Sequence, residues 1–227
     1  MKTDFLTLDA IEAFDRDGYI VVENLLDDQE TMLLGTIARR DHALAASRTS
    51  RADGEGGSVD LVVENELPAD SIYSAIVQAE PLVSAMESLL GDEVYHYHHK
   101  MILKEPRVGG AWTWHQDYGY WYNNGCLLPD MASCMFAVDQ ATKENGCLQV
   151  LRGSHRMGRI DHIKRGDQTG ADMERVNAAL QRMDLVHVEM TPGSAVLFHG
   201  NTLHRSDQNI SEKPRWAFIC CYNTRSN

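Results

Sequence analysis

A mainly β fold with flanking helices, of the jelly-roll type, is the class that the sequence predicts, and two observations lead to it. Beyond about residue 93, short β-prone runs alternate with turn signals such as RVGG, ATKENG and TPG. Many short strands joined in this way are typical of a sandwich or jelly roll. The first ninety residues instead read mostly as helix, so helices are expected to flank the strands. A chain of 227 residues with 43% hydrophobic side chains fits one domain, residues 1–227, with a buried core.

The N-terminal part, about residues 1–92, is expected to carry these helices. Thr7 can cap a short helix that ends at Gly18, and YIVV then reads as a strand. The apolar spacing from DDQE to about Ala46 favours a longer amphipathic helix. Glycine and charge in the following RADGEGGS predict that this helix is interrupted there.

One more helix is expected before the strands begin. Asp70 can cap it, it runs to Gly91, and Pro81 predicts a kink or a division in two. The jelly-roll core is expected over about residues 93–227, in runs that include EVYHYHHKMILKEP, AWTWHQDYGY, MASCMFAVDQA, CLQVLRGS, LVHVEM, SAVLFHG and RWAFICCYN. The charged, partly helix-like stretch at about 161–182 predicts an insertion over one mouth of the barrel.

Charge and composition exclude several classes of partner. The chain carries 33 acidic against 21 basic residues, a formal net charge of −12, which disfavours nucleic acid and anionic membranes. The N-terminus lacks an apolar run of signal-peptide length and no later segment approaches a membrane span, so a cytoplasmic protein with a small-molecule substrate is expected. The five cysteines form no C-x-x-C pair and read as reduced thiols packed in the core. No oligomeric state follows from the sequence.

The stretch AWTWHQDYGYW, residues 111–121, carries the first chemical signal. On a strand, residues two apart project from the same face, so His115 and Asp117 would converge while Gln116 points away. An imidazole and a carboxylate oxygen suit divalent iron, and the 2-His-1-carboxylate set then needs one further histidine. The spacing alone equally fits a hydrogen-bonded pair without a metal, so a third ligand must decide.

Seven histidines compete for this third position. Most must serve other purposes, and the cluster at 96–99 favours either an edge strand or imidazoles that surround a site without touching its metal. A zinc site in that cluster would lack the cysteines or further spaced ligands that structural zinc uses. The candidates are His96, His98, His99, His155, His162, His199 and His204.

Four segments together resemble the phytanoyl-CoA dioxygenase family of iron(II)- and 2-oxoglutarate-dependent oxygenases. They are FDRDGYIVVENLL, WHQD, ENGCLQVLRGSH and LFHGNTLHRSDQNISEKPR, in the order that the family has them. The resemblance extends from about Ile11 to the last strand. It implies a double-stranded β-helix, a cupin-like jelly roll flanked by helices, which agrees with the pattern of strands.

The resemblance also implies a set of site residues. The H-x-D motif falls on His115 and Asp117, and the distal histidine of the family falls on His204. The arginine that holds the far carboxylate of 2-oxoglutarate in the family follows eleven residues later, at Arg215, and the family's serine falls on Ser206. The implied cofactors are Fe(II), 2-oxoglutarate and O2, with succinate and CO2 released. Charge-assisted hydrogen bonds would hold the cosubstrate's far carboxylate.

The chain departs from the family pattern at two positions and leaves one choice open. Arg152 stands where many relatives have proline before GSH, and Met135 stands where a tryptophan is common beside the cosubstrate. A lysine on the strand before the paired glycines often reaches 2-oxoglutarate in the family. Lys100 and Lys104 share a face of this strand, and both remain candidates.

The expected substrate is a small polar metabolite. Tyr118, Tyr120 and Trp121 are expected to wall the cavity, although some of these rings can equally be ordinary packing. Arg152, Arg156 or Arg159 is available to hold an acidic group of the substrate, although these arginines can equally be surface charges. His155 is a further candidate at the site, where it would lie behind the metal ligands, or it merely completes the turn.

Oxygenation, as hydroxylation, demethylation or desaturation, is the expected chemistry. Related halogenases have a small residue in place of the carboxylate, whereas this chain keeps Asp117. Two other readings are a cupin-type metal-dependent isomerase or hydrolase and a noncatalytic jelly-roll binding protein. Arg215 disfavours the first, and the intact ligand set disfavours the second.

Overall fold

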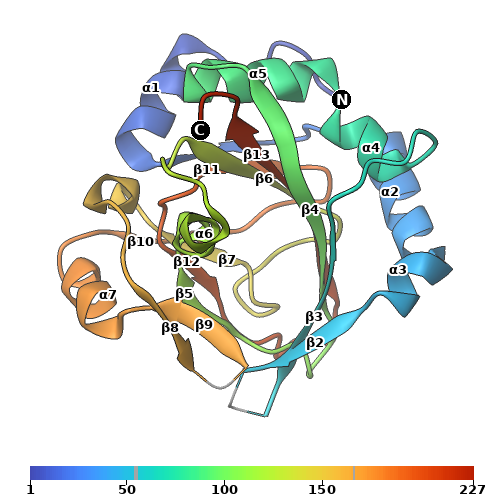
Figure 1. Ribbon diagram of the computed structural model, residues 1–227. Coiled ribbons are helices and arrows are strands. Elements are labelled where there is room, and N and C mark those ends of the chain that lie inside the picture. Colours follow the sequence, from blue (N-terminus) through green and yellow to red (C-terminus); the bar gives the residue numbers. More distant parts are fainter. Residues whose placement is uncertain (54–55, 166) are drawn as a thin grey trace.

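The protein is built on two antiparallel sheets (Figure 1), seen in a computed structural model that describes residues 1–53, 56–165 and 167–227. Within these residues the larger sheet has seven strands, in the order β1-β11-β6-β13-β4-β3-β2. Its strands are β1 (Tyr19–Val22), β2 (Thr49–Ala52), β3 (Ser58–Glu64), β4 (Val94–Lys104), β6 (Met131–Ala137), β11 (Ala195–His199) and β13 (Arg215–Thr224).

The smaller sheet faces the inner side of the larger one. In the described part of the chain it has four strands in the order β10-β7-β12-β5. Its strands are β5 (Trp112–His115), β7 (Leu148–Leu151), β10 (Leu185–Val188) and β12 (His204–Ser206). Apolar side chains from both sheets, such as Val150 of β7 and Val196 of β11, form one buried cluster between them. The predicted jelly-roll fold is therefore confirmed.

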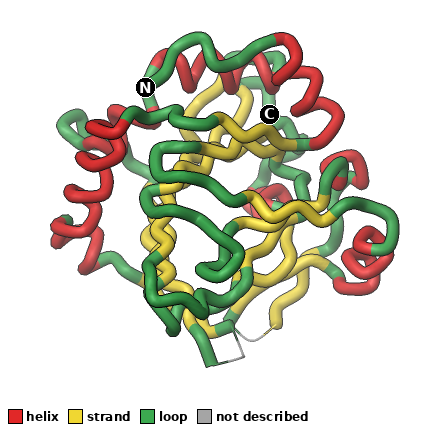
Figure 2. The backbone as a smooth tube through the Cα atoms, turned by 180° about the vertical axis from the view of Figure 1, so that it is seen from behind, coloured by secondary structure: helices red, strands yellow, loops and turns green. Residues whose placement is uncertain are grey.

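Helices from the N-terminal part of the chain cover the outer face of the larger sheet. These are α1 (Leu8–Asp17), α2 (Asp28–Arg40), α3 (His42–Ala46), α4 (Ile72–Val77) and α5 (Glu80–Leu90). Figure 2 shows the strands gathered in the middle of the molecule with the helices around them. A second buried cluster, which includes Leu82, Met86, Phe136 and Phe218, joins these helices to the sheet. These two clusters thus cover the two faces of the larger sheet, and a third, which includes Trp114, Leu151 and Val176, joins the smaller sheet to α7.

Alternation along β13 explains how adjacent cysteines contribute to both layers. Cys220 packs into the cluster under the helices, and Cys221 packs into the cluster between the sheets. All five cysteines of the chain are buried and unpaired, as predicted. Because successive strand residues point to opposite faces, two neighbouring thiols here serve two separate cores.

The first helix follows its sequence signals closely. The Thr7 hydroxyl accepts a hydrogen bond from the Ala10 amide at 3.2 Å, so it caps α1 as predicted. Gly18 adopts φ 84°, which favours glycine, and its amide donates to the Phe14 carbonyl at 2.8 Å. The chain then passes directly into β1.

Two expectations for the following stretch were wrong or incomplete, and a third is confirmed. The long helix is divided into α2 and α3 because the Asp41 carboxylate accepts from the amides of Ala43 and Leu44, at 2.9 and 3.0 Å, and starts a new helix. Ser71, rather than Asp70, caps α4. The division of the next helix before Pro81 is confirmed, since α4 and α5 are separate.

A hairpin was missed within the part expected to be helical. Strands β2 and β3 pair antiparallel and extend the larger sheet beyond β4. The glycine-rich break at 51–58 thus overlaps the ends of two paired strands, and its residues 54 and 55 lie outside the described residues. The hairpin places β2 next to the insertion predicted at 161–182 (Figure 1).

This insertion is a hairpin followed by a helix. It contains β8 (His162–Arg165), β9 (Gln168–Ala171) and α7 (Met173–Leu180). The hairpin forms its own two-stranded sheet, and β9 packs beside β5 of the smaller sheet. Of its residues, 166 is outside the described part. None of the helices in the described residues has both the length and the apolar character that crossing a membrane requires.

Candidate metal centre and active site

The H-x-D motif lies where a strand gives way to a helix. His115 is the last residue of β5, Gln116 is extended with φ −113° and ψ 135°, and Asp117 is the first residue of α6 (Asp117–Trp121). The expectation that both side chains stand on one strand was therefore wrong. They still converge, because Gln116 continues the extended direction before the chain turns, and His115 Nε2 lies 3.9 Å from Asp117 Oδ1.

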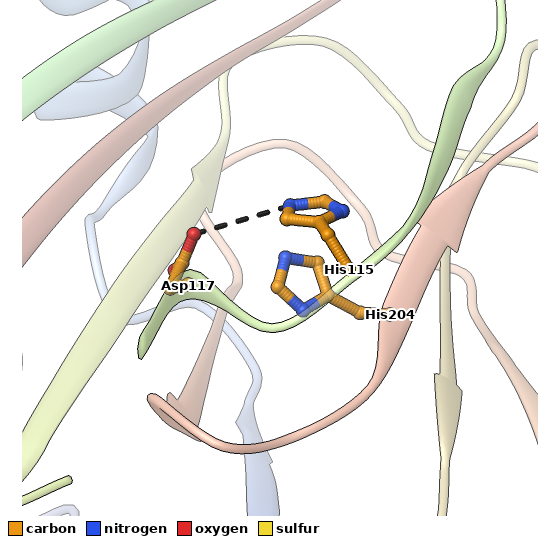
Figure 3. A group of neighbouring side chains, drawn as sticks. All are labelled: His115, Asp117 and His204. Atoms are coloured by element: carbon orange, nitrogen blue, oxygen red, sulfur yellow. Dashed lines mark ion pairs between the residues drawn. The ribbon is translucent and has the colours of Figure 1, made fainter. Parts of the chain in front are cut away.

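His204 completes the group from the neighbouring strand. It is the first residue of β12 and lies opposite His115 in the antiparallel pairing with β5. Figure 3 shows the two imidazole rings side by side, with the Asp117 carboxylate next to them. One ligand atom from each of the three residues lies within 4.8 Å of the other two, and all three residues are buried.

Hydrogen bonds fix both imidazoles in the orientation that a metal needs. His115 Nδ1 donates to the Thr113 carbonyl at 2.8 Å, and His204 Nδ1 donates to the Thr202 carbonyl at 2.9 Å. A carbonyl only accepts, so the proton must reside on Nδ1 and the Nε2 lone pair is left for a ligand. Outer partners of this kind orient metal-binding imidazoles.

The carboxylate of Asp117 is held in the same way. Its Oδ2 accepts a hydrogen bond from the Ser133 hydroxyl at 2.8 Å, and Lys100 Nζ lies 3.7 Å from Oδ1. Burial alone would raise the pKa of Asp117, but Lys100, the two imidazoles and Ser133 outweigh it and lower the pKa. The group is thus a carboxylate at neutral pH.

Burial has the opposite consequence for the histidines. It lowers the pKa of His115 and of His204, so both imidazoles are neutral at neutral pH. Two neutral imidazoles and one carboxylate on one side of a cavity are the donor set of the 2-His-1-carboxylate iron centre, which leaves positions open for other ligands. The residues present fit that metal.

A single cavity connects this group to Arg215. The cavity is also lined by Lys100, Met135 and Ser206. Arg215, the first residue of β13, is 3% exposed, and its Nη2 donates to the Gly146 carbonyl at 2.6 Å. Burial lowers the pKa of Arg215 to about 10, so it remains a cation at neutral pH. Among the described residues its buried Nε has no hydrogen-bond partner.

This arrangement suits an anion. A buried guanidinium with an unused donor is costly unless an acceptor reaches it. The cavity supplies the space, and its lining includes Ser206 together with His115, Asp117 and His204. A dicarboxylate that reaches from the metal to Arg215 would satisfy both ends.

The two candidate lysines occupy different places. Lys100 lines the cavity beside Asp117. Lys104 is fully buried, lies opposite Arg215 in the strand register, and donates to the Asp207 carbonyl. Both lysines lie on one face of β4, but of the two only Lys100 lines the cavity.

A second, outer cavity opens from the first. The two share Lys100, Asp117 and Tyr120, and the outer one has a volume of about 620 Å³. Tyr120 and Trp121 line it as expected. Tyr118 does not, because its ring is buried and its hydroxyl donates to the Leu127 carbonyl at 2.6 Å. Tyr118 is a packing residue at the start of α6.

Sequence reasoning missed several residues of the outer cavity. Trp112 lies within the quoted aromatic stretch, and only its nearness to His115 in the sequence could have indicated it, because strand alternation groups it with Trp114, which is packed in a buried cluster. Asn124 follows α6 closely in the sequence, and His98 belongs to the 96–99 cluster that was expected to surround a site. No local signal identifies the others, because the two hairpins and β4 bring them in from distant segments. They are Arg51, Asn65, Tyr97, Gln168 and Thr169.

Arg152 and His155 are placed away from both cavities. Arg152 lies 3.6 Å from Asp184 in a surface ion pair, just beyond the end of β7. The ring of His155 lies 3.1 Å from the Asp15 carbonyl through Nε2, and so attaches the turn after β7 to α1. The expectation that these two residues contact the substrate was therefore wrong, because the chain has already left the barrel where they lie.

The other histidines also have defined places. β4 has β3 as a partner only as far as His99, so His96 and His98 pair with β13 alone and the interpretation of a partly exposed edge strand is confirmed for them. His99 Nδ1 and His96 Nε2 share a hydrogen bond of 3.2 Å, and His98 lines the outer cavity. His199 ends β11 and packs on Phe14. It lies on a different strand from His204, and this separation, rather than alternation along one strand, keeps it away from the metal-binding group.

Comparison with known proteins agrees with this geometry. The sequence profile of the family described as phytanoyl-CoA dioxygenase matches residues 14–217. The chain belongs to the phytanoyl-CoA dioxygenase family. The resemblance seen in the four sequence motifs is thereby confirmed, and the chain is a 2-oxoglutarate-dependent dioxygenase with iron and 2-oxoglutarate as its cofactors.

Individual relatives in the family share most of their length with this chain. L-proline trans-4-hydroxylase of Streptomyces griseoviridis is 28% identical, over 97% of this chain and 87% of its own. Ectoine dioxygenase of Sphingopyxis alaskensis is 31% identical, over 95% of this chain and 75% of its own. The crystal structure of EctD from S. alaskensis with 2-oxoglutarate and 5-hydroxyectoine superimposes with a TM-score of 0.83 at 28% identity, covering 100% of this chain and 79% of that one.

Proposed function

We propose that this enzyme hydroxylates a small polar metabolite in a reaction that consumes 2-oxoglutarate and O2 and releases succinate and CO2. The observation that carries this proposal is the cavity whose lining includes both the buried group of His115, Asp117 and His204 and the guanidinium of Arg215, whose buried Nε has no hydrogen-bond partner among the described residues. Metal ligands alone fit several chemistries. A buried cation in the lining of the same cavity fits a dicarboxylate cosubstrate.

The three metal ligands would be His115 Nε2, His204 Nε2 and a carboxylate oxygen of Asp117. When bound there, iron(II) supplies the activation of O2 that is coupled to oxidative decarboxylation of 2-oxoglutarate. The protein's part is to hold both imidazoles as neutral donors through the carbonyls of Thr113 and Thr202. Neither ring then needs to lose a proton when the metal binds.

Arg215 and Ser206 would hold the far carboxylate of 2-oxoglutarate. The guanidinium Nε is free to donate and the Ser206 hydroxyl lines the same cavity. Lys100, rather than Lys104, would be the lysine that contributes to the cosubstrate pocket. Its ammonium group already lies in the cavity, whereas the ammonium group of Lys104 is engaged by the Asp207 carbonyl.

Met135 would leave this part of the pocket less crowded than the tryptophan common in the family. It lines the cavity from β6, with its flexible side chain next to Ile219 of β13. A thioether side chain adapts to the shape of a bound molecule at low cost. Met135 would therefore form an apolar wall of the cosubstrate pocket.

The outer cavity would receive the primary substrate. Its aromatic wall of Trp112, Tyr120 and Trp121 limits access of water to the metal, and the cation Arg51 suits an acidic group on the substrate. Relatives named for proline and ectoine support a small polar substrate of this kind. Retention of Asp117 among the ligands favours hydroxylation over halogenation.

The test is an aerobic assay of the purified enzyme with Fe(II) and 2-oxoglutarate against a panel of free amino acids, cyclic imino acids and cyclic amidines. We expect one compound class to stimulate succinate release and to gain the mass of one oxygen atom. Product analysis by mass spectrometry separates this outcome from uncoupled turnover of the cosubstrate. If no compound is oxidised and the iron-loaded enzyme does not bind 2-oxoglutarate, the proposal is wrong.

A further inference from the structure

Gln116, the residue between the two ligands of the H-x-D motif, has a side chain that is entirely buried and fully used. Its Nε2 donates to the carbonyls of Gly158 and Asn201, both at 2.8 Å, and its Oε1 accepts from the Ile160 amide at 2.7 Å. The side chain points away from the metal-binding group, as predicted. It connects the motif with the segment that leads into β8 and with the turn that leads into β12.

The backbone of Gln116 has a partner in the insertion. Its amide donates to His162 Nε2 at 2.9 Å, and His162 Nδ1 donates to the Ile160 carbonyl at 2.8 Å. His162 is the first residue of β8. An amide only donates and a carbonyl only accepts, so this pair of bonds fixes His162 as a neutral imidazole with its proton on Nδ1.

The ring of His162 also lies against the helix that begins with Asp117. A Cβ atom at Gly119 would overlap this ring, and Gly119 is the third residue of α6. Glycine is not needed there for its backbone conformation, since its φ is not positive. The close approach of the imidazole is the reason for glycine at this position.

Two more contacts attach the hairpin to the site. The Tyr120 hydroxyl donates to the Thr169 carbonyl, and Gln168 Oε1 accepts from the Thr113 amide at 2.9 Å. The Thr113 carbonyl in turn holds His115. The β8–β9 hairpin is thus bonded to both sides of the H-x-D motif, on β5 and on α6 (Figure 1).

We propose that His162 and Gln116 are positioning residues that set the distance between the two ligands of the H-x-D motif. This inference rests on the proposed metal site. The peptide between His115 and Asp117 has its amide held by the His162 ring and its side chain held by the segment 158–160. The insertion therefore acts as a support of the metal centre, and its hairpin is part of the wall instead of a segment that opens over it.

The test compares metal binding by two His162 variants. His162→Phe keeps a ring over Gly119 but leaves the Gln116 amide without an acceptor, whereas His162→Gln can return an oxygen close to the position of Nε2. Loss of an outer partner commonly lowers metal affinity 10–100-fold. We expect about this loss in His162→Phe, together with a shifted ligand-field spectrum of the Co(II)-loaded protein, and an affinity within about threefold of the parent in His162→Gln.

His155→Phe is the matched control, because His155 also bonds a backbone carbonyl but lies outside both cavities. It should leave Co(II) affinity and spectrum unchanged. Thermal unfolding of the metal-free variants reports general destabilisation separately. A purely structural role would lower the unfolding temperature of His162→Phe without altering the spectrum, and that result would overturn the proposal.

A second pair of variants avoids dependence on His162→Phe. Gly119→Ala should weaken Co(II) binding at least tenfold by displacing the ring, because its Cβ overlaps His162. In a His162→Ala background the same substitution should add less than threefold, since the obstacle is gone. Equal effects in the two backgrounds would contradict the inference. Failure of the parent to bind Co(II) or 2-oxoglutarate would instead contradict the proposed function.

Discussion

His204 and His115 lie opposite each other on the antiparallel strands β12 and β5, with their ring centroids 4.0 Å apart. Each ring donates through Nδ1 to the carbonyl two residues before it. The same local hydrogen bond thus occurs on two paired strands, and it directs both Nε2 atoms toward the carboxylate of Asp117. The strand register, rather than any single loop, sets the separation of the two imidazoles.

His204→Ala should abolish tight binding of iron, and His199→Ala should keep most of it. His204 belongs to the three-residue group, whereas His199 packs between Phe14 and His155 on a different strand. Competition of the two variants against a chelator of known affinity measures the difference. Equal loss of metal in both would show that the assignment of the third ligand is wrong.

Asp117→Asn should remove turnover while the chain stays folded. The amide retains the shape of the side chain and an acceptor for the Ser133 hydroxyl, but not the charge that a divalent ion needs. Its effect on metal affinity should exceed that of Ser133→Ala, which removes only an outer partner and is expected to cost about 10-fold. Metal titration together with far-ultraviolet circular dichroism checks both statements. An unfolded Asp117→Asn variant would indicate that the carboxylate is structural.

Stability should fall as the pH drops from about 7.5 to 5.5, in part because of His199. Burial lowers the pKa of His199 from 6.5 to about 4, so the unfolded chain binds a proton that the folded chain excludes. This contribution is fully present above the unfolded pKa and is lost as the pH falls below it. The loss amounts to about 1 kcal/mol of unfolding free energy over this interval.

The matched variant is His199→Asn, whose side-chain oxygen can replace Nδ1 as acceptor for the Asn201 amide. His155 lies against the same ring and burial lowers its pKa too, so some pH dependence should remain in the variant. Denaturant unfolding of parent and variant at both pH values gives the difference. A variant as pH-sensitive as the parent would show that His199 does not contribute.

Local sequence patterns predicted those parts of the fold that local interactions determine. Thr7 and Gly18 mark the two ends of α1 as predicted, because a helix cap depends only on hydrogen bonds to residues close to it in the sequence. The hairpin of β2 and β3 was missed, since its pairing with β4 is a long-range contact. The glycine-rich sequence RADGEGGS was interpreted as the end of a helix. Arg51 and Thr169 were not predicted for the same reason, because they reach the outer cavity only after the hairpins pack.

The site shows the same division. The spacing of His115, Asp117, His204 and Arg215 was readable from motifs, and the structure brings all four to one cavity. The backbone conformation around Asp117 could not be predicted from motifs, because the β-prone residues that follow it form a helix held by distant partners. Arg152 follows directly after β7 but forms a surface ion pair with Asp184. Its nearness in sequence to the GSH motif therefore did not predict its position correctly.

The central claim, that the cavity holds 2-oxoglutarate between the metal and Arg215, is tested by the cosubstrate affinity of Arg215→Gln. Anaerobic titration of the iron-loaded protein, followed through the metal-to-ligand charge-transfer band, measures this affinity directly. Arg152→Gln is the matched control, since the same substitution is made outside both cavities. Arg215→Lys should restore binding only in part, because a point charge lacks the planar pair of donors.

Removing the partner of a buried charge costs on the order of 3–5 kcal/mol, or roughly a hundredfold to a few thousandfold in affinity. We therefore expect Arg215→Gln to bind 2-oxoglutarate at least a hundredfold more weakly while its iron affinity and that of the control stay at the parent value. An Arg215→Gln protein that binds 2-oxoglutarate within about threefold of the parent, a difference of only ~0.7 kcal/mol, would contradict the account.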